Sequence, residues 1–125
     1  MKQREKIISN YIDAYNSFDV ESMLTDFDPS IKFKNISNGI INMTLVGLPA
    51  FRQQAEQAKN LFLIRQQTIK SYQHKNDETR IEIEYQATLA IDLPNGLKQG
   101  DELNLVGSSI FKFLDDRIIA LTDIS

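Results

Sequence analysis

A chain of 125 residues is the length of one domain, and 42% hydrophobic with 25% charged residues is ordinary globular composition. The net charge of −3 argues against binding to the phosphate backbone of nucleic acids, which usually requires a basic surplus. The absence of cysteine excludes thiol catalysis and cysteine-ligated metals. The chain has no apolar run of signal-peptide or membrane-spanning length. We therefore expect a soluble, cytoplasmic protein that binds neither membranes nor nucleic acid.

The first half of the chain carries the helical signals. Apolar residues recur at helical spacing over residues 2–18, which predicts an amphipathic first helix. Asp19 suits the cap of a short second helix, and Pro29 prevents the residue before it from continuing that helix. Gly47 breaks the chain, and Pro49 suits the first turn of a third helix. The apolar face of this third helix is formed by Phe51, Ala55, Ala58 and Phe62.

Three strand candidates surround the third helix. Residues 31–36 alternate imperfectly between apolar and polar side chains, and the turn signal at 37–39 ends this short strand. Residues 40–46 are either a second short strand or irregular. Residues 65–75 are a polar strand candidate with weak periodicity, followed by an Asn-Asp turn.

The strongest strand signal is the segment 80–93, where Ile, Tyr, Ala and Leu alternate with more polar residues. A Pro-Asn-Gly sequence at 94–96 predicts a hairpin turn after it. Two further strands are expected within 100–114 and 117–125. Gly107, inside the first of these, would permit a bend or bulge in the sheet.

Helices followed by meandering antiparallel strands define a single α+β domain over residues 1–125. We expect a strongly curved, cone-shaped sheet, with about three helices from the N-terminal half packed on its concave face. This arrangement is a cystatin-like α+β roll, and it leaves a conical cavity between the helices and the sheet.

Four segments resemble the nuclear transport factor 2-like superfamily, particularly its ketosteroid isomerase and SnoaL-like polyketide cyclase branches. The most specific is YIDAYNSFDVESMLTDF, which resembles the family's first two helices. The others are IKFKN, GLPAFRQQ and the closing hairpin IFKFLDDRIIALTDIS. The resemblance extends over essentially the whole chain and implies the cone-shaped fold, but fold alone does not imply a reaction.

Ketosteroid isomerase uses an Asp base and an oxyanion hole made by a Tyr and a protonated Asp. The resemblance places Tyr11 at the position of the Tyr, Asn35 on or near that of the base, and Ser109 on or near that of the second oxyanion donor. Both carboxylates are therefore replaced. An amide cannot accept and return a proton near neutral pH, so Asn35 does not fit a general base.

The SnoaL-like branch suggests a different acid. In that branch an Asp near the end of the last strand transfers protons, and the final segment RIIALTDIS places Asp123 there. Asp123 has the strand parity of Ile119 and Leu121, so it would point into the cavity if that face is the inner one. Burial would then raise its pKa, which suits acid-base chemistry. The alternative is a half-solvated carboxylate near the chain end that satisfies backbone groups.

The first functional hypothesis is a binding protein whose cavity accepts a compact, apolar or amphipathic molecule without catalysis. The second is a SnoaL-like cyclase, isomerase or hydrolase that uses Asp123 for proton transfer. The third is a dimeric interaction module. The expected ligand-binding residues are Tyr11, Tyr15, Phe33, Asn35, Phe51, Ser109 and Phe111.

No cofactor or metal is expected, because the single histidine, His74, cannot by itself form a His-rich metal site. We predict a homodimer formed through the outer face of the sheet, where Val106, Ile110, Ile118 and Ala120 have the parity opposite to Ser109 and Asp123.

Overall fold

The computed structural model describes residues 1–125 as three α-helices, one turn of 3₁₀-helix and six strands. In chain order these elements are α1 (Lys2–Asn16), α2 (Val20–Met23), β1 (Phe27–Ser37), β2 (Ile40–Val46), α3 (Leu48–Ala58), η1 (Lys59–Leu61), β3 (Phe62–Lys75), β4 (Glu78–Leu89), β5 (Glu102–Leu114) and β6 (Arg117–Ile124).

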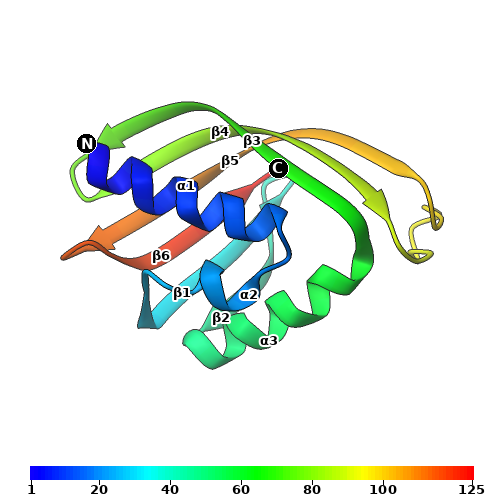
Figure 1. Ribbon diagram of the computed structural model, residues 1–125, viewed down its shortest axis with the longest axis horizontal. Coiled ribbons are helices and arrows are strands. Elements are labelled where there is room, and N and C mark those ends of the chain that lie inside the picture. The colour runs from blue at the N-terminus through cyan, green and yellow to red at the C-terminus, as the bar shows by residue number, and fades with distance from the viewer.

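The six strands form one mixed sheet in the order β2-β1-β6-β5-β4-β3. Strands β1 and β6 are parallel, and all other neighbours are antiparallel. The sheet is strongly curled, with β3, β4 and β5 arching over the helices, and α1 crosses its concave side while α2 and α3 lie beside β1 and β2 (Figure 1). The predicted α+β roll with three helices on a curved sheet is confirmed.

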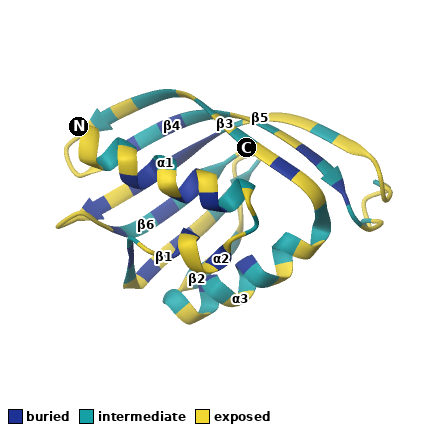
Figure 2. Ribbon diagram, in the orientation of Figure 1, coloured by how far each residue is buried: buried dark blue, intermediate teal, exposed yellow.

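The hydrophobic core lies where α1 and α2 meet the concave side of β1, β6 and β5. Buried segments face each other across this space in Figure 2, while the outer parts of the helices are exposed. Phe111, Ile8, Ile81 and Ile118 are completely enclosed, because helical spacing on α1 and alternation on the strands direct their side chains to the same interior. None of the helices is both long and apolar enough to cross a membrane.

Strand β1 begins at Phe27, four residues earlier than predicted, and includes Pro29. Proline lacks the N–H that a regular ladder needs. The strand tolerates it because the pairing with β6 shifts register between Phe27 and Lys32, and the pairing with β2 begins only at Lys32. Asp19 caps α2 as expected, its side chain accepting a hydrogen bond from the backbone N–H of Ser22 at 3.2 Å.

Strand β4 ends at Leu89, and the prediction that it extends to Leu93 is wrong. Ala90 N–H still donates to the carbonyl of Leu61, but the next residue, Ile91, is 44% exposed and lies in the connection to β5. The Pro-Asn-Gly turn exists, with Gly96 at φ 93°, but it lies inside a longer connection over residues 90–101. It is therefore not the tight hairpin turn that was predicted.

A register shift changes the inner face of β6. The shift lies between Lys112 and Phe113, where Phe113 pairs with Ile118 and Lys112 pairs with Ala120, so Ile119 has no partner on β5. Ile118 consequently points inward and is completely buried. The prediction that Ile118 lies on the outer face is wrong, because strict alternation does not continue through a bulge.

Gly107 serves a different purpose from the predicted bulge, since the pairing of β4 with β5 is continuous through it. A Cβ atom at this position would lie 2.8 Å from the carbonyl oxygen of Ile124. Real Cβ atoms do not approach a backbone oxygen so closely, so only glycine lets the end of β6 lie this close to β5 here. The close approach fixes the residue next to Asp123.

Candidate functional site

Three polar residues form one row across the centre of the sheet. Asn35 on β1 pairs with Asp123 on β6, and Asp123 pairs with Ser109 on β5. Residues in one such row emerge on the same side of a sheet. Here that side is the concave one, toward which Tyr11 projects from α1. The structure therefore brings together the four polar residues that the sequence singled out.

A cavity of about 390 Å³ lies between this row and the helices. Eleven of its fifteen lining residues are hydrophobic, and the charged ones are Arg65 and Asp123. The complete lining is Tyr11, Tyr15, Met23, Phe33, Asn35, Met43, Leu45, Phe51, Gln54, Ala55, Ala58, Leu61, Phe62, Arg65 and Asp123. Its size and its few polar groups are typical of small-molecule sites.

Asp123 is the acid of this cavity. The Ser109 hydroxyl donates a hydrogen bond to its Oδ1 at 2.7 Å. Burial raises the pKa of Asp123 to about 6, and the Ser109 hydrogen bond opposes part of that increase because it favours the ionised form. A carboxyl group with this pKa can both accept and release a proton near neutral pH.

Tyr11 places a phenol close to this acid. Its ring stacks on Phe27 with centroids 5.4 Å apart and meets Phe111 edge-on at 5.7 Å. Burial raises the pKa of Tyr11 well above its ordinary value, and the negative charge of Asp123 raises it further. Tyr11 therefore remains a neutral phenol, which can donate a hydrogen bond into the cavity.

Two further tyrosines extend the polar part of the site. The hydroxyls of Tyr15 and Tyr85 are hydrogen-bonded at 2.9 Å, and burial raises the pKa of both. Tyr15 lines the main cavity and an adjoining hollow of about 210 Å³, which also contains Tyr85, Ser109 and the other side of Asp123. The tyrosine pair therefore lies at the boundary between the two spaces.

Arg65 is the residue that sequence reasoning missed. It lies on β3 yet is only 2% exposed, and its Nε donates to the carbonyl oxygen of Tyr15 at 2.8 Å. Its guanidinium lies 3.7 Å from the centroid of the Tyr15 ring and 4.7 Å from that of Phe18. The sequence did contain a signal, because Arg65 and Gln67 are polar at inward positions of a strand.

The other expected ligand contacts divide between the cavity and its surroundings. Asn35 lines the cavity, and its side-chain N–H donates to Asn42 Oδ1 at 2.8 Å, which holds the amide at the exposed end of the site. Ser109 lines the adjoining hollow and positions Asp123. Phe111 is completely enclosed in the core and does not line the cavity. Tyr15, Phe33 and Phe51 line the cavity.

His74 lies outside this site. Its Nε2 is 2.7 Å from Glu5 Oε2 and its Nδ1 is 2.8 Å from Thr79 Oγ1, so it joins the start of α1 to the end of β3. No three His, Cys, Asp or Glu side chains lie close enough together to hold a metal ion.

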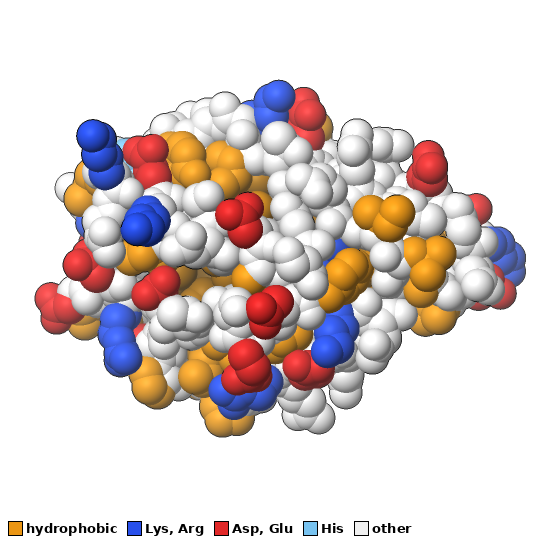
Figure 3. Space-filling view, viewed as in Figure 1, with side chains coloured by type: hydrophobic (Ala, Val, Ile, Leu, Met, Phe, Trp, Pro, Cys, Tyr) orange, Lys and Arg blue, Asp and Glu red, His pale blue; other side chains and the backbone are white.

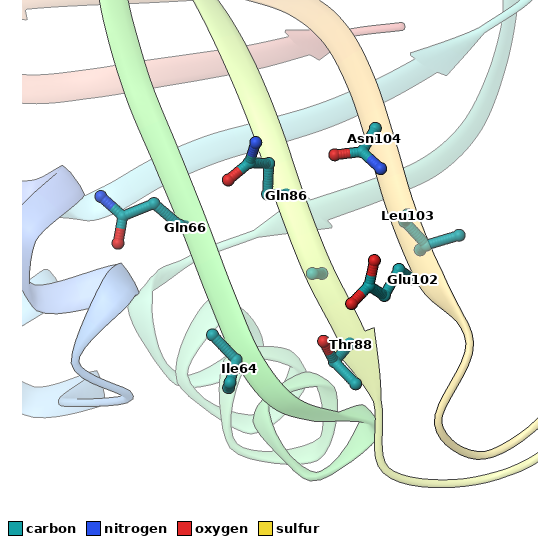
Figure 4. Close-up of a pocket in the computed structure, with 8 residues that line it drawn as sticks. Ile64, Gln66, Gln86, Thr88, Glu102, Leu103 and Asn104 are labelled. Atoms are coloured by element: carbon teal, nitrogen blue, oxygen red, sulfur yellow. The ribbon is translucent and has the colours of Figure 1, made fainter.

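A second hollow, of about 230 Å³, lies on the outer side of β3, β4 and β5. Figure 4 shows Gln66, Gln86 and Asn104 side by side across these strands, with Ile64, Thr88 and Glu102 in the next row. Ile64 is 63% exposed, and the acid Glu102 is also exposed. This outer hollow is lined mainly by polar side chains, whereas the inner cavity is lined mainly by hydrophobic ones.

No protein-family model matches the sequence, and no curated protein is significantly similar to it. Solved structures do match. A protein assigned as a SnoaL-like polyketide cyclase from Jannaschia sp. CCS1 is 10% identical, with 98% of this chain and 84% of that chain covered and a TM-score of 0.83. An NTF2-like protein of unknown function from Burkholderia pseudomallei K96243 is 12% identical, with 98% and 90% covered and a TM-score of 0.75.

A third similar structure is a hypothetical protein with a ketosteroid isomerase-like fold from Catenulispora acidiphila DSM 44928, solved in complex with trimethylamine. It is 14% identical, with 94% of this chain and 82% of that chain covered and a TM-score of 0.76. The chain therefore has the nuclear transport factor 2-like fold, in the form shared by SnoaL-like and ketosteroid isomerase-like proteins. This confirms the fold that the sequence resemblance implied.

Proposed function

We propose that this protein binds a compact, mostly apolar or amphipathic small molecule in the cavity above the Asn35–Asp123–Ser109 row. The observation that carries the proposal is a carboxyl group of raised pKa in the wall of a mainly hydrophobic cavity of about 390 Å³. Polar groups that converge in an apolar cavity orient a ligand, while the apolar lining supplies most of its affinity. Asn35 in place of a base argues against the ketosteroid isomerase reaction.

Filling the cavity is expected to abolish binding. Ala58 lines the cavity from the end of α3, so Ala58→Trp would place an indole in the ligand's space. Naphthalene-2-sulfonamide is a suitable neutral probe because it is compact and aromatic. Isothermal titration or probe fluorescence should show saturable binding to the wild type and at least roughly tenfold weaker binding to the variant.

The matched control is Gln57→Trp, which adds the same side chain to an exposed position beside Ala58. It should bind the probe like the wild type. Equal binding by Ala58→Trp and Gln57→Trp, with both folded, would contradict the location of the site.

Proton transfer by Asp123 is the second candidate function, and the observation that favours it is the raised pKa of this buried acid. Tyr11 and Tyr15 would orient the substrate, and Ser109 holds the carboxyl group in place. A protein assigned as a polyketide cyclase has the same fold, which supports a cyclase, isomerase or hydrolase reaction of this kind.

A homodimer formed through the outer face of the sheet remains a prediction. Val106 is 77% exposed and Ile64 is 63% exposed, and both have the outward parity of their strands. On the opposite, helical side, acidic and basic side chains are mixed (Figure 3). Analytical ultracentrifugation at micromolar concentration should show a dimer that Val106→Lys weakens, because a charge would be buried in the contact. A monomeric wild type would contradict this prediction.

A further inference from the structure

Arg65 is a buried cation without a counter-ion. It is 2% exposed, and none of the ion pairs in the structure includes it. Only its Nε is hydrogen-bonded, and its Nη2 is enclosed without any partner. An arginine cannot lose its proton in a protein, so the positive charge persists. Burial of an unpaired charge is costly, which makes this side chain exceptional within the molecule.

The acid that lines the same cavity does not neutralise Arg65. Arg65 and Asp123 form no ion pair, and the only side-chain hydrogen bond to the Asp123 carboxyl group comes from the Ser109 hydroxyl. Arg65 does lower the pKa of Tyr11 and Tyr15 by its positive charge, so its field reaches the phenols of the cavity. The cation and the acid therefore line one cavity without forming an ion pair.

The aromatic contacts of Arg65 fix its position without neutralising its charge. The rings of Tyr15 and Phe18 support the guanidinium, and the carbonyl of Tyr15 holds Nε. Cation–π contacts and one neutral acceptor stabilise a guanidinium less than a carboxylate does. The terminal nitrogens of Arg65 still lack an oxygen acceptor. Arg65 borders the cavity, which could hold a ligand that supplies one.

We infer that Arg65 is an anion-binding site within the cavity, and that the ligand carries an acidic oxygen group, such as a carboxylate or an enolate, on a compact apolar body. This inference rests on the proposed function and specifies its ligand class. The planar guanidinium would receive the anionic oxygen, while the apolar wall formed by Phe33, Phe51 and Phe62 contacts the rest of the molecule. The ligand's other end would then face Asp123 and Tyr11.

Two probes of equal shape test the charge preference. Naphthalene-2-sulfonate is anionic at all relevant pH values, whereas naphthalene-2-sulfonamide is neutral. Titrations at about pH 5, where Asp123 is largely protonated, avoid repulsion from its carboxylate. The wild type should bind the sulfonate at least roughly tenfold more tightly than the sulfonamide, as expected for a hydrogen bond to a charged group.

Variants assign the preference to Arg65. Arg65→Met removes the charge at similar side-chain length. This variant should bind the sulfonate and the sulfonamide about equally, with sulfonamide affinity retained. Arg65→Gln keeps a donor for the Tyr15 carbonyl and serves the same purpose if the Met variant does not fold. Lys70→Met removes a positive charge from an exposed position of the same strand and should leave the preference unchanged.

The outcomes separate this inference from the proposed function. Equal binding of both probes by the wild type, or a preference that survives in the folded Arg65 variants, would overturn the anion site alone. Binding of neither probe would overturn both the anion site and the proposed function.

Discussion

Replacing Asp123 with Asn is expected to stabilise this protein at pH 8 and to abolish any proton-transfer activity. Asp123 is half-buried, and desolvation raises the pKa of its carboxyl group from 3.8 to about 6, so ionising it in the folded protein is unfavourable. Asn is uncharged at every pH, and its carbonyl oxygen can accept the hydrogen bond that Ser109 donates to Asp123.

The direction of the pH dependence follows from the raised pKa. The folded protein holds the Asp123 proton more tightly than the unfolded chain, so this contribution to stability is complete below about pH 3.8. It is lost as the pH rises through about 6. A shift of about two units corresponds to roughly 3 kcal/mol.

Urea denaturation at pH 4 and pH 8 measures this effect. The free energy of unfolding of Asp123→Asn, relative to the wild type, should increase by about 2.4 kcal/mol between the two pH values, because the unfolded chain has already released part of the Asp123 proton at pH 4. Asp116→Asn, in the exposed β5–β6 turn, is the matched control and should show no such change. A constant difference for Asp123→Asn would mean that the carboxylate is hydrated in the folded protein.

The same variant decides between the two candidate functions. If Asp123 transfers protons, any turnover found for the wild type should fall by roughly 10² to 10⁴ in Asp123→Asn, because an amide cannot exchange a proton with the substrate. Loss of turnover together with increased stability would distinguish a chemical role from unfolding. Unchanged turnover would contradict the proton-transfer hypothesis and leave ligand binding as the function.

Phe111→Ala is expected to cause the largest loss of stability among these substitutions, about 3–5 kcal/mol. The side chain is completely enclosed and supports Tyr11 edge-on, so its removal leaves a void that the surrounding core cannot fill. Since small domains have only about 5–15 kcal/mol of stability in total, thermal denaturation should show a marked decrease in Tm.

Phe33→Ala provides the comparison, because Phe33 forms part of the cavity wall and is 9% exposed. Its truncation enlarges an existing space and should cost less, about 2 kcal/mol, while weakening probe binding. Phe111→Ala, measured at a temperature where it remains folded, should keep its affinity for the sulfonamide within about threefold of the wild type. The opposite pattern would mean that Phe111 contacts the ligand after all.

The sequence predicted the fold well where local signals agree with the tertiary structure. The spacing of apolar residues located α1, the cap at Asp19 located α2, and the turn at 37–39 separated β1 from β2. The boundaries that failed depend on partners distant in the chain. Pro29 fits β1, for example, because the pairing of β1 with β6 is interrupted between Phe27 and Lys32.

The site was predictable in part for the same reason. Alternation and resemblance placed Asn35, Ser109 and Asp123 in one row, because the β1–β6 and β5–β6 ladders are continuous through all three. Arg65 was missed because a buried cation contradicts the rule that inward strand positions are apolar. Its isolation from any carboxylate can be recognised only when the surrounding side chains are in place.

The position of β6 has a consequence for how the molecule forms. This strand comes latest among the six in the sequence, yet it is the only link between the pair β2-β1 and the trio β5-β4-β3. A nascent chain that has not yet synthesised residues 117–124 therefore cannot join the two halves of its sheet. Contacts between residues so far apart in sequence slow folding. The cavity and its acid should consequently form together, in the final step of assembly.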